Sequence, residues 1–134
     1  MRLNLVLAAS FALVTTAAQA GDLADANAAF DHKDYAKAFA LYQPLAKAGT
    51  AEAQSAIGAM YFFGNGTMRN PSRAYMWFDL AARAPSPIAT VAATNREIVR
   101  RQMAASEIRD ADAMAAQCLN SRYEQCGLTQ FAAR

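Results

Sequence analysis

Two sixteen-residue stretches repeat the same pattern thirty-six positions apart, and this repeat constrains the fold more than any other feature of the chain. They read DYAKAFALYQPLAKAG (residues 34–49) and NPSRAYMWFDLAARAP (residues 70–85). Basic residues, small residues and bulky apolar residues coincide: Lys37 with Arg73, Ala38 with Ala74, Phe39 with Tyr75, Leu41 with Trp77, Tyr42 with Phe78, Ala46 with Ala82, and Lys47 with Arg83. A period in the mid-thirties built from helix pairs is typical of an α-solenoid, in which each hairpin buries its apolar face against its neighbours.

Helix signals fill the chain between these repeats. Apolar residues recur at helical spacing, alanine is abundant, and no run of alternating β-branched residues predicts a strand. We expect helices to start after Asp34, Thr50, Asn70 and Ser106, which are good N-cap residues. Pro44 lies inside the second of the expected helices and predicts a kink or a break there.

These signals predict an all-α fold, a short right-handed α-solenoid of about three antiparallel helix hairpins. The expected repeat-like units span about residues 22–49, 50–85 and 86–121 within a helical domain at residues 21–127. Residues 128–134 are expected to form a flexible tail.

The N-terminus carries the features of a signal peptide. Arg2 precedes an apolar stretch from Leu5 to Val14 that is too short to span a bilayer, and Ala18-Gln19-Ala20 is a small-x-small cleavage site. The alternative is a buried N-terminal helix, but the segment lacks the polar face of one. We expect cleavage after Ala20, a periplasmic or secreted product, and no membrane span in the mature chain.

Removing this leader changes the formal net charge from +2 to +1 by the loss of Arg2. Such a near-neutral chain gives no electrostatic reason to expect a nucleic-acid or membrane-surface partner. Cys118 and Cys126 are the only cysteines, and in an exported chain they most simply form one disulfide. A reactive thiol or half of a metal site is the alternative, although no histidine or second cysteine pair lies nearby in the sequence.

The segment AEAQSAIGAMYFFGNGTMRNPSRAYMWFDLAARA, residues 51–84, resembles a Sel1-like repeat, a relative of the tetratricopeptide repeat. The resemblance rests on the Ala-Gln pair at Ala53, the aliphatic-Gly-x-Met-Tyr step, the Gly-x-Gly loop, and the Ala-x-x-Trp and double-Ala pattern. The residues to which it gives a structural role are Ala53, Ile57, Gly58, Tyr61, Gly64, Gly66, Ala74, Trp77, Ala81 and Ala82. Residues 35–49 resemble a truncated first unit, and residues 115–127 resemble a helical C-terminal cap. Thr67 and Asn70 depart from the family, which usually has Val and often Asp there.

This resemblance implies that Gly64 and Gly66 let the chain reverse between two helices. A phosphate-binding loop is the alternative, but a Gly-x-Gly without a preceding strand is weak evidence for it. Asn65 begins a glycosylation sequon, although Asn-Gly is first a turn dipeptide. His32 is the only histidine and lies in a polar turn, where we expect it to be solvated rather than to bind a metal.

We find no spacing typical of a nucleophile elbow, a zinc protease or a pair of catalytic carboxylates, and we expect neither catalysis nor a cofactor. The resemblance implies a scaffold that binds another protein or peptide on a concave surface, in cell-envelope signalling or assembly. Arg96, Arg100 and Arg101 are candidate contacts for an acidic partner, and a solvated helix face is the alternative. The alternative function is an envelope hydrolase or a β-lactam- or peptidoglycan-binding protein. The partner and the oligomeric state stay open.

Overall fold

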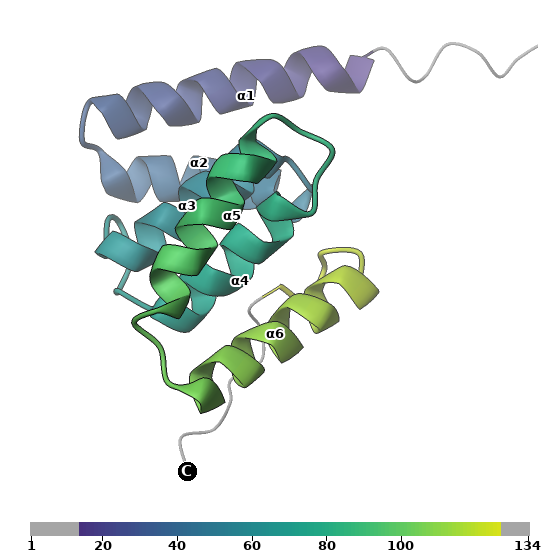
Figure 1. The fold of residues 1–134 in the computed structure, drawn as a ribbon. Coiled ribbons are helices and arrows are strands. Elements are labelled where there is room, and N and C mark those ends of the chain that lie inside the picture. Colours follow the sequence, from purple (N-terminus) through teal and green to yellow (C-terminus); the bar gives the residue numbers. More distant parts are fainter. Residues whose placement is uncertain (1–13, 127–134) are drawn as a thin grey trace, which may run out of the picture.

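The computed structural model describes residues 14–126, with side chains from residue 20 onward. That part of the chain folds into six α-helices and contains no strand, as the sequence predicts (Figure 1). The helices are α1 (Val14–Asp31), α2 (Tyr35–Lys47), α3 (Ala51–Phe63), α4 (Pro71–Ala82), α5 (Ile88–Arg100) and α6 (Ala105–Asn120).

Neighbouring helices pack in order along the chain. α1 packs on α2 and α3 on α4 as hairpins, while α2 against α3 and α4 against α5 join one hairpin to the next. This arrangement is an α-solenoid, because each layer buries its apolar face against the adjacent layer. The third unit differs from the first two, since α6 makes its main contacts with α4 rather than along α5 (Figure 1).

Helix α4 is the most deeply buried element of the described chain. Its residues 74–81 are all buried, although the sequence pattern predicts only one apolar stripe. The reason is that α3, α5 and α6 all pack on it and together surround it. Trp77 and Phe78 are therefore core residues, at 3% and 2% exposure.

The predicted helix starts follow from local capping chemistry. The carboxylate of Asp34 accepts the backbone N–H of Lys37 at 3.3 Å, and the side chain of Asn70 accepts that of Arg73 at 2.9 Å. Helix α3 also begins after Thr50, but without a side-chain cap bond. The predicted start after Ser106 is wrong: α6 begins at residue 105, and the Glu107 carboxylate accepts the backbone N–H of residue 104 at 2.7 Å.

Helix α2 does not break at Pro44 but continues to Lys47. Pro44 lies in the last turn, so its missing N–H removes a single hydrogen bond of the helix. The carbonyl of Pro44 still accepts the backbone N–H of Ala48 at 2.9 Å. Burial of Leu45 and Ala46, directly after the proline, favours continuation of the helix.

The loop between α3 and α4 depends on two glycines in the left-handed conformation, as predicted. Gly64 has φ +76° and ends α3, and Gly66 has φ +69°. Gly66 has a second role that the sequence pattern does not indicate. A β-carbon there would collide with the backbone carbonyl of Tyr35, because the loop lies directly on the start of α2.

This difference between the two glycines predicts different effects of alanine. We expect Gly64→Ala to lower the free energy of unfolding by about 1 to 2 kcal/mol, since a β-carbon is strained at positive φ. Gly66→Ala adds the backbone collision and is expected to lose at least about 2 kcal/mol. Urea denaturation followed by circular dichroism measures both. Equal losses would contradict the close contact between the loop and α2.

Candidate functional site

Two of the exposed large apolar side chains, Phe63 and Ile98, line one hollow of the described surface. Four large apolar side chains are about half exposed or more: Phe63 at the end of α3, Met68 in the loop that follows it, and Val91 and Ile98 on α5. Leu119 on α6 is the remaining exposed large apolar residue of the described chain, at 36% exposure. Single exposed apolar residues are ordinary, whereas a gathered set marks a surface suited to a partner.

The hollow has a volume of about 120 Å³ and lies between α3 and α5. We call it the α3–α5 groove, and its lining is apolar apart from Asn95: Ala59, Phe62, Phe63, Phe78, Asn95, Ile98 and Val99. The Phe62 and Phe63 rings pack edge to face with centroids 5.0 Å apart. A cavity of about 150 Å³ holds a benzene molecule, so this volume suits one large apolar side chain.

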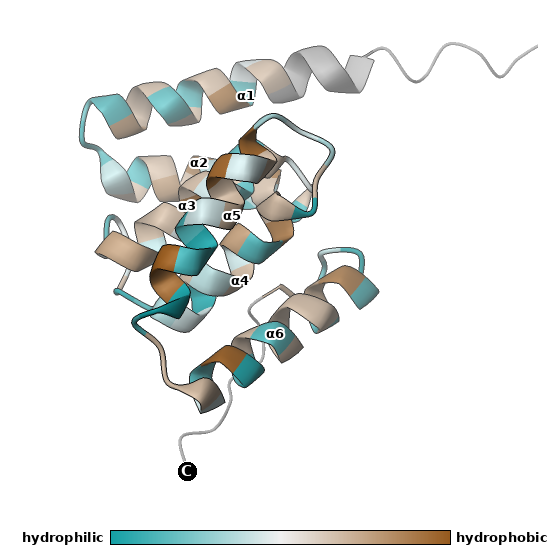
Figure 2. Ribbon diagram, in the orientation of Figure 1, coloured by the Kyte–Doolittle hydropathy of each residue, from teal (hydrophilic) through white to brown (hydrophobic). Residues whose placement is uncertain are grey.

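Close packing below the groove is permitted by Gly58. A β-carbon at Gly58 would lie 3.0 Å from the ring of Phe78, so the glycine lets α4 approach α3. The sequence predicts this role for Gly58. Figure 2 shows that α5, which forms the other wall, carries both hydrophobic and hydrophilic segments, as expected for a helix with one solvent-facing side.

Arg69 lies at the rim of the groove. Its guanidinium carbon is 5.6 Å from the centroid of the Phe62 ring, a cation–π distance. Its Nη2 also donates to Oε1 of Gln102 at 3.4 Å, which links the α3–α4 loop to the end of α5. Arg69 was not among the predicted partner contacts, because a lone arginine in a loop carries no recognisable sequence pattern.

The three arginines proposed as partner contacts do not form one patch. Arg96 turns toward α4, where its Nη1 lies 2.6 Å from the carboxylate of Asp79. Arg100 holds Glu97 through two hydrogen bonds of 2.7 and 2.8 Å, and Arg101 approaches the same carboxylate at 3.4 Å. The hydrogen bonds from Arg100 are the main cause that lowers the pKa of Glu97 to about 2. The Arg101 side chain is 75% exposed and is the most accessible of the three.

Asp79 is a buried carboxylate in the middle of α4, with its side chain 3% exposed. Arg83, one turn further along, binds its other oxygen at 2.8 Å, and Asp79 raises the pKa of Arg83 through this hydrogen bond and its charge. Burial raises the pKa of the neighbouring Tyr75, with a further contribution from Asp112 on α6. The i,i+4 spacing of Asp79 and Arg83 is the signal that would have indicated an ion pair. Nothing in the sequence indicates the bond from Arg96.

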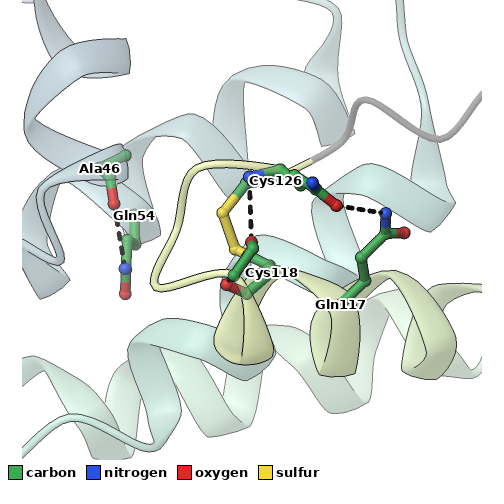
Figure 3. The surroundings of a disulfide bond; sticks show 7 residues. Ala46, Gln54, Gln117, Cys118 and Cys126 are labelled. Carbon is green, nitrogen blue, oxygen red and sulfur yellow. Dashed lines mark hydrogen bonds between the residues drawn. A yellow bond between two sulfur atoms is a disulfide. The ribbon is translucent and has the colours of Figure 1, made fainter.

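Cys118 and Cys126 form the predicted disulfide (Figure 3). It ties the turn after α6 back to that helix, and Gln117 donates to Gln125 at 3.0 Å across the same loop. Tyr123 in this turn has φ +69°, and its ring packs against Gly49, between α2 and α3. The turn therefore connects the last helix to the first repeat.

Most residues with a predicted structural role are buried. Ala53, Ile57, Gly58, Tyr61, Ala74, Trp77 and Ala81 are buried, whereas Ala82 is partly exposed and Gly64 and Gly66 lie in the loop. Among residues 14–126, no group of three His, Cys, Asp or Glu side chains is placed to hold a metal ion, and His32 is exposed. None of the helices in this part of the chain is long and apolar enough to cross a membrane.

Helix hairpins stacked through apolar and small residues define the chain as an α-solenoid. Residues 33–50 and 51–86 match the family model of the Sel1 repeat, so the chain carries Sel1 repeats over residues 33–86. No curated protein matches it.

A solved structure with a similar fold is that of a protective antigen present in uropathogenic Escherichia coli strains, which displays an SLR fold. The TM-score is 0.72 and the sequence identity 22%, so the likeness concerns the fold alone. The match covers 87% of this chain and 27% of the antigen chain. The chain therefore spans about a quarter of the length of that antigen.

The burial of Asp79 predicts unequal effects of two arginine substitutions on α5. Arg96→Ala leaves a buried carboxylate with one fewer partner, so we expect it to lower the free energy of unfolding by about 1 to 3 kcal/mol. Arg100→Ala removes an ion pair on the surface and serves as the matched control, with little measurable change expected. Thermal and urea denaturation of both variants give the comparison. Similar losses would show that Asp79 does not depend on Arg96.

The disulfide also predicts a measurable contribution to stability. Replacing both cysteines with serine is expected to lower the free energy of unfolding by about 2 to 3 kcal/mol, because the cross-link restricts the unfolded chain. Denaturation with and without a reducing agent tests this. The reducing agent should destabilise the wild-type protein and leave the double variant unchanged, and an unaffected wild type would argue against a stabilising bond.

Proposed function

We propose that this chain is an exported protein–protein interaction scaffold that binds a partner protein or peptide through the α3–α5 groove, in cell-envelope signalling or assembly. Sel1-repeat folds are generally protein–protein interaction scaffolds and are generally not enzymes. The observation that carries the proposal is one largely apolar hollow lined by two exposed side chains, Phe63 and Ile98.

The groove suits a partner because its walls are rigid and its rim is accessible. α3 and α5 both pack on the buried helix α4, so the two walls do not need to be ordered when a partner arrives. Phe63 is 68% exposed and Ile98 46%, and a partner that covers them removes apolar surface from water. An aromatic and an aliphatic side chain around a pocket are a common form of interaction hot spot.

Export forms part of the same proposal and is supported by the predicted leader at residues 1–20. Residues 1–13 lie outside the described part of the chain, and α1 begins at Val14, before the expected cleavage site. The described contacts between α1 and α2 lie after that site. Ala26 and Ala29 are buried, and the hydroxyl of Tyr42 donates to Oδ1 of Asn27 at 2.6 Å. Cleavage after Ala20 leaves these contacts in place.

A capture experiment with two matched variants tests the groove. Ile98→Asp places a charge in the apolar lining, and Leu119→Asp makes the same kind of change on α6. With the chain from residue 21 as bait in cross-linked envelope extracts, we expect wild type and Leu119→Asp to capture the same partner and Ile98→Asp to lose it. A desolvated carboxylate in an apolar contact accounts for that loss.

Circular dichroism establishes that both variants are folded, and Phe63→Ala provides a second, milder change at the same groove. Capture of an unchanged set of proteins by Ile98→Asp and Phe63→Ala would show that the partner binds elsewhere. Capture lost equally in the Leu119→Asp variant would point to α6 instead.

A further inference from the structure

We infer that the α3–α5 groove takes an amphipathic helical segment of the partner, with its acidic N-terminal end held at Arg69 and Arg101. The inference rests on the proposed function and adds the chemistry and direction of the partner. It follows from the length of the two helices that flank the groove, the charges at their two ends and the electrostatics of helix ends.

The two helices that form the walls run in the same direction. α3 and α5 start side by side, because the hydroxyl of Ser86, just before α5, donates to the carboxylate of Glu52 in the first turn of α3 at 2.9 Å. They also end together at the hollow, which both Phe63 and Ile98 line. From Glu52 to Phe63 the wall is about 16 Å long at 1.5 Å per residue. A partner helix of about three turns matches that length.

Helical spacing extends the apolar lining away from the hollow along both walls. On α3, Ala56 and Ala59 lie on the same face as Phe63. On α5, Val91 lies two turns before Ile98 on one face, and it is half exposed. Small side chains on one wall and branched side chains on the other leave a surface that suits the apolar stripe of a helix.

The two ends of the groove carry opposite charges. Glu52 lies at the end where both walls begin, and Arg69 and Arg101 lie where they finish. Arg69 makes no ion pair with any carboxylate among the described residues. Arg101 shares the single carboxylate of Glu97 with Arg100, so a net positive charge remains there. This end of the groove is therefore complementary to acidic side chains.

Helix electrostatics then fix the direction of the partner. Acidic residues stabilise the N-terminal turn of a helix, where the backbone N–H groups are unpaired and the macrodipole is positive. The carbonyl ends of α3 and α5 lie at the basic end of the groove. A partner helix that begins there places its own positive dipole end near these carbonyls and its acidic side chains near Arg69 and Arg101. It runs antiparallel to α3 and α5.

Synthetic peptides test the charge and the direction together. We would use three twelve-residue peptides with one leucine stripe at helical spacing: the first with three glutamates in its first turn, the second with the same glutamates in its last turn, and the third with lysines in its first turn. Fluorescence anisotropy against the chain from residue 21 gives each Kd. We expect the first peptide to bind most tightly, and its affinity to fall as salt is added.

Charge reversal at the rim gives the matched comparison. In the Arg69→Glu/Arg101→Glu variant we expect the first peptide to bind about tenfold more weakly and the lysine peptide to become the better ligand. Arg109→Glu, an exposed position on α6, makes the same kind of charge change away from the groove and is expected to leave all three affinities unchanged.

The outcomes separate the inference from the proposed function. Equal binding of the three peptides, or binding that ignores the double charge reversal, would overturn the acidic, oriented partner, and so would failure of every peptide to bind. The capture experiment with Ile98→Asp tests independently whether a partner binds at the α3–α5 groove. A partner lost in that variant supports the proposed function even if the acidic helix is wrong.

Discussion

The bond between Asp79 and Arg96 joins the buried helix α4 to α5, which forms one wall of the α3–α5 groove. Asp79 lies in a helix that is buried on all sides, where an uncompensated carboxylate would be strongly unfavourable. Arg83 from the same helix supplies one guanidinium, but the second comes from α5. The charge that must be neutralised inside the core therefore holds α5 against α4. Since α3 packs on the same central helix, this bond is one of the contacts that hold the two groove walls in place.

Close contacts at three glycines also bring neighbouring segments together. Gly58 lets the Phe78 ring lie against α3, and Gly66 lets the α3–α4 loop rest on the backbone at the start of α2. Gly49 receives the ring of Tyr123 from the turn that the disulfide closes. Each contact joins segments that are distant in the sequence. Together they explain how a chain with a modest core and many alanines can fix its helices closely, because small residues bring backbones together and increase dispersion contacts.

The parts of this fold that the sequence predicts are those with local causes. The starts of α2, α3 and α4 follow from side chains within a few residues, and the repeat at residues 34–49 and 70–85 indicates hairpins that stack. The packing of α6 on α4 has no local signal, since helical spacing shows which face is apolar but not which neighbour covers it. The predicted break at Pro44 does not occur. Pro44 lies in the last turn of α2 and the next residue, Leu45, is buried, and neither feature is evident from the sequence alone.

The candidate binding surface is also only partly predictable from the sequence. Spacing along α5 indicated a basic cluster of Arg96, Arg100 and Arg101, but it could not show that Arg96 pairs with Asp79, seventeen residues earlier. Nor could it show that Arg69 reaches across from another loop to the same end of the groove. Both omissions have one cause: the position of a long, flexible arginine side chain depends on the segments that pack against it in the folded protein.

Core residues and residues at the rim of the groove have different roles in this geometry. The central helix α4 and its ion pairs hold the walls, whereas Phe63, Ile98, Arg69 and Arg101 project from those walls and support little of the core. Substitutions at the rim can therefore alter which partner binds while the stacked helices stay intact, since exposed positions generally tolerate change within about 0.5 kcal/mol. A change at Asp79 or Gly58 would instead move the walls themselves. In the proposed binding mode, these few exposed side chains would contact the partner, whereas Asp79 lies buried behind them.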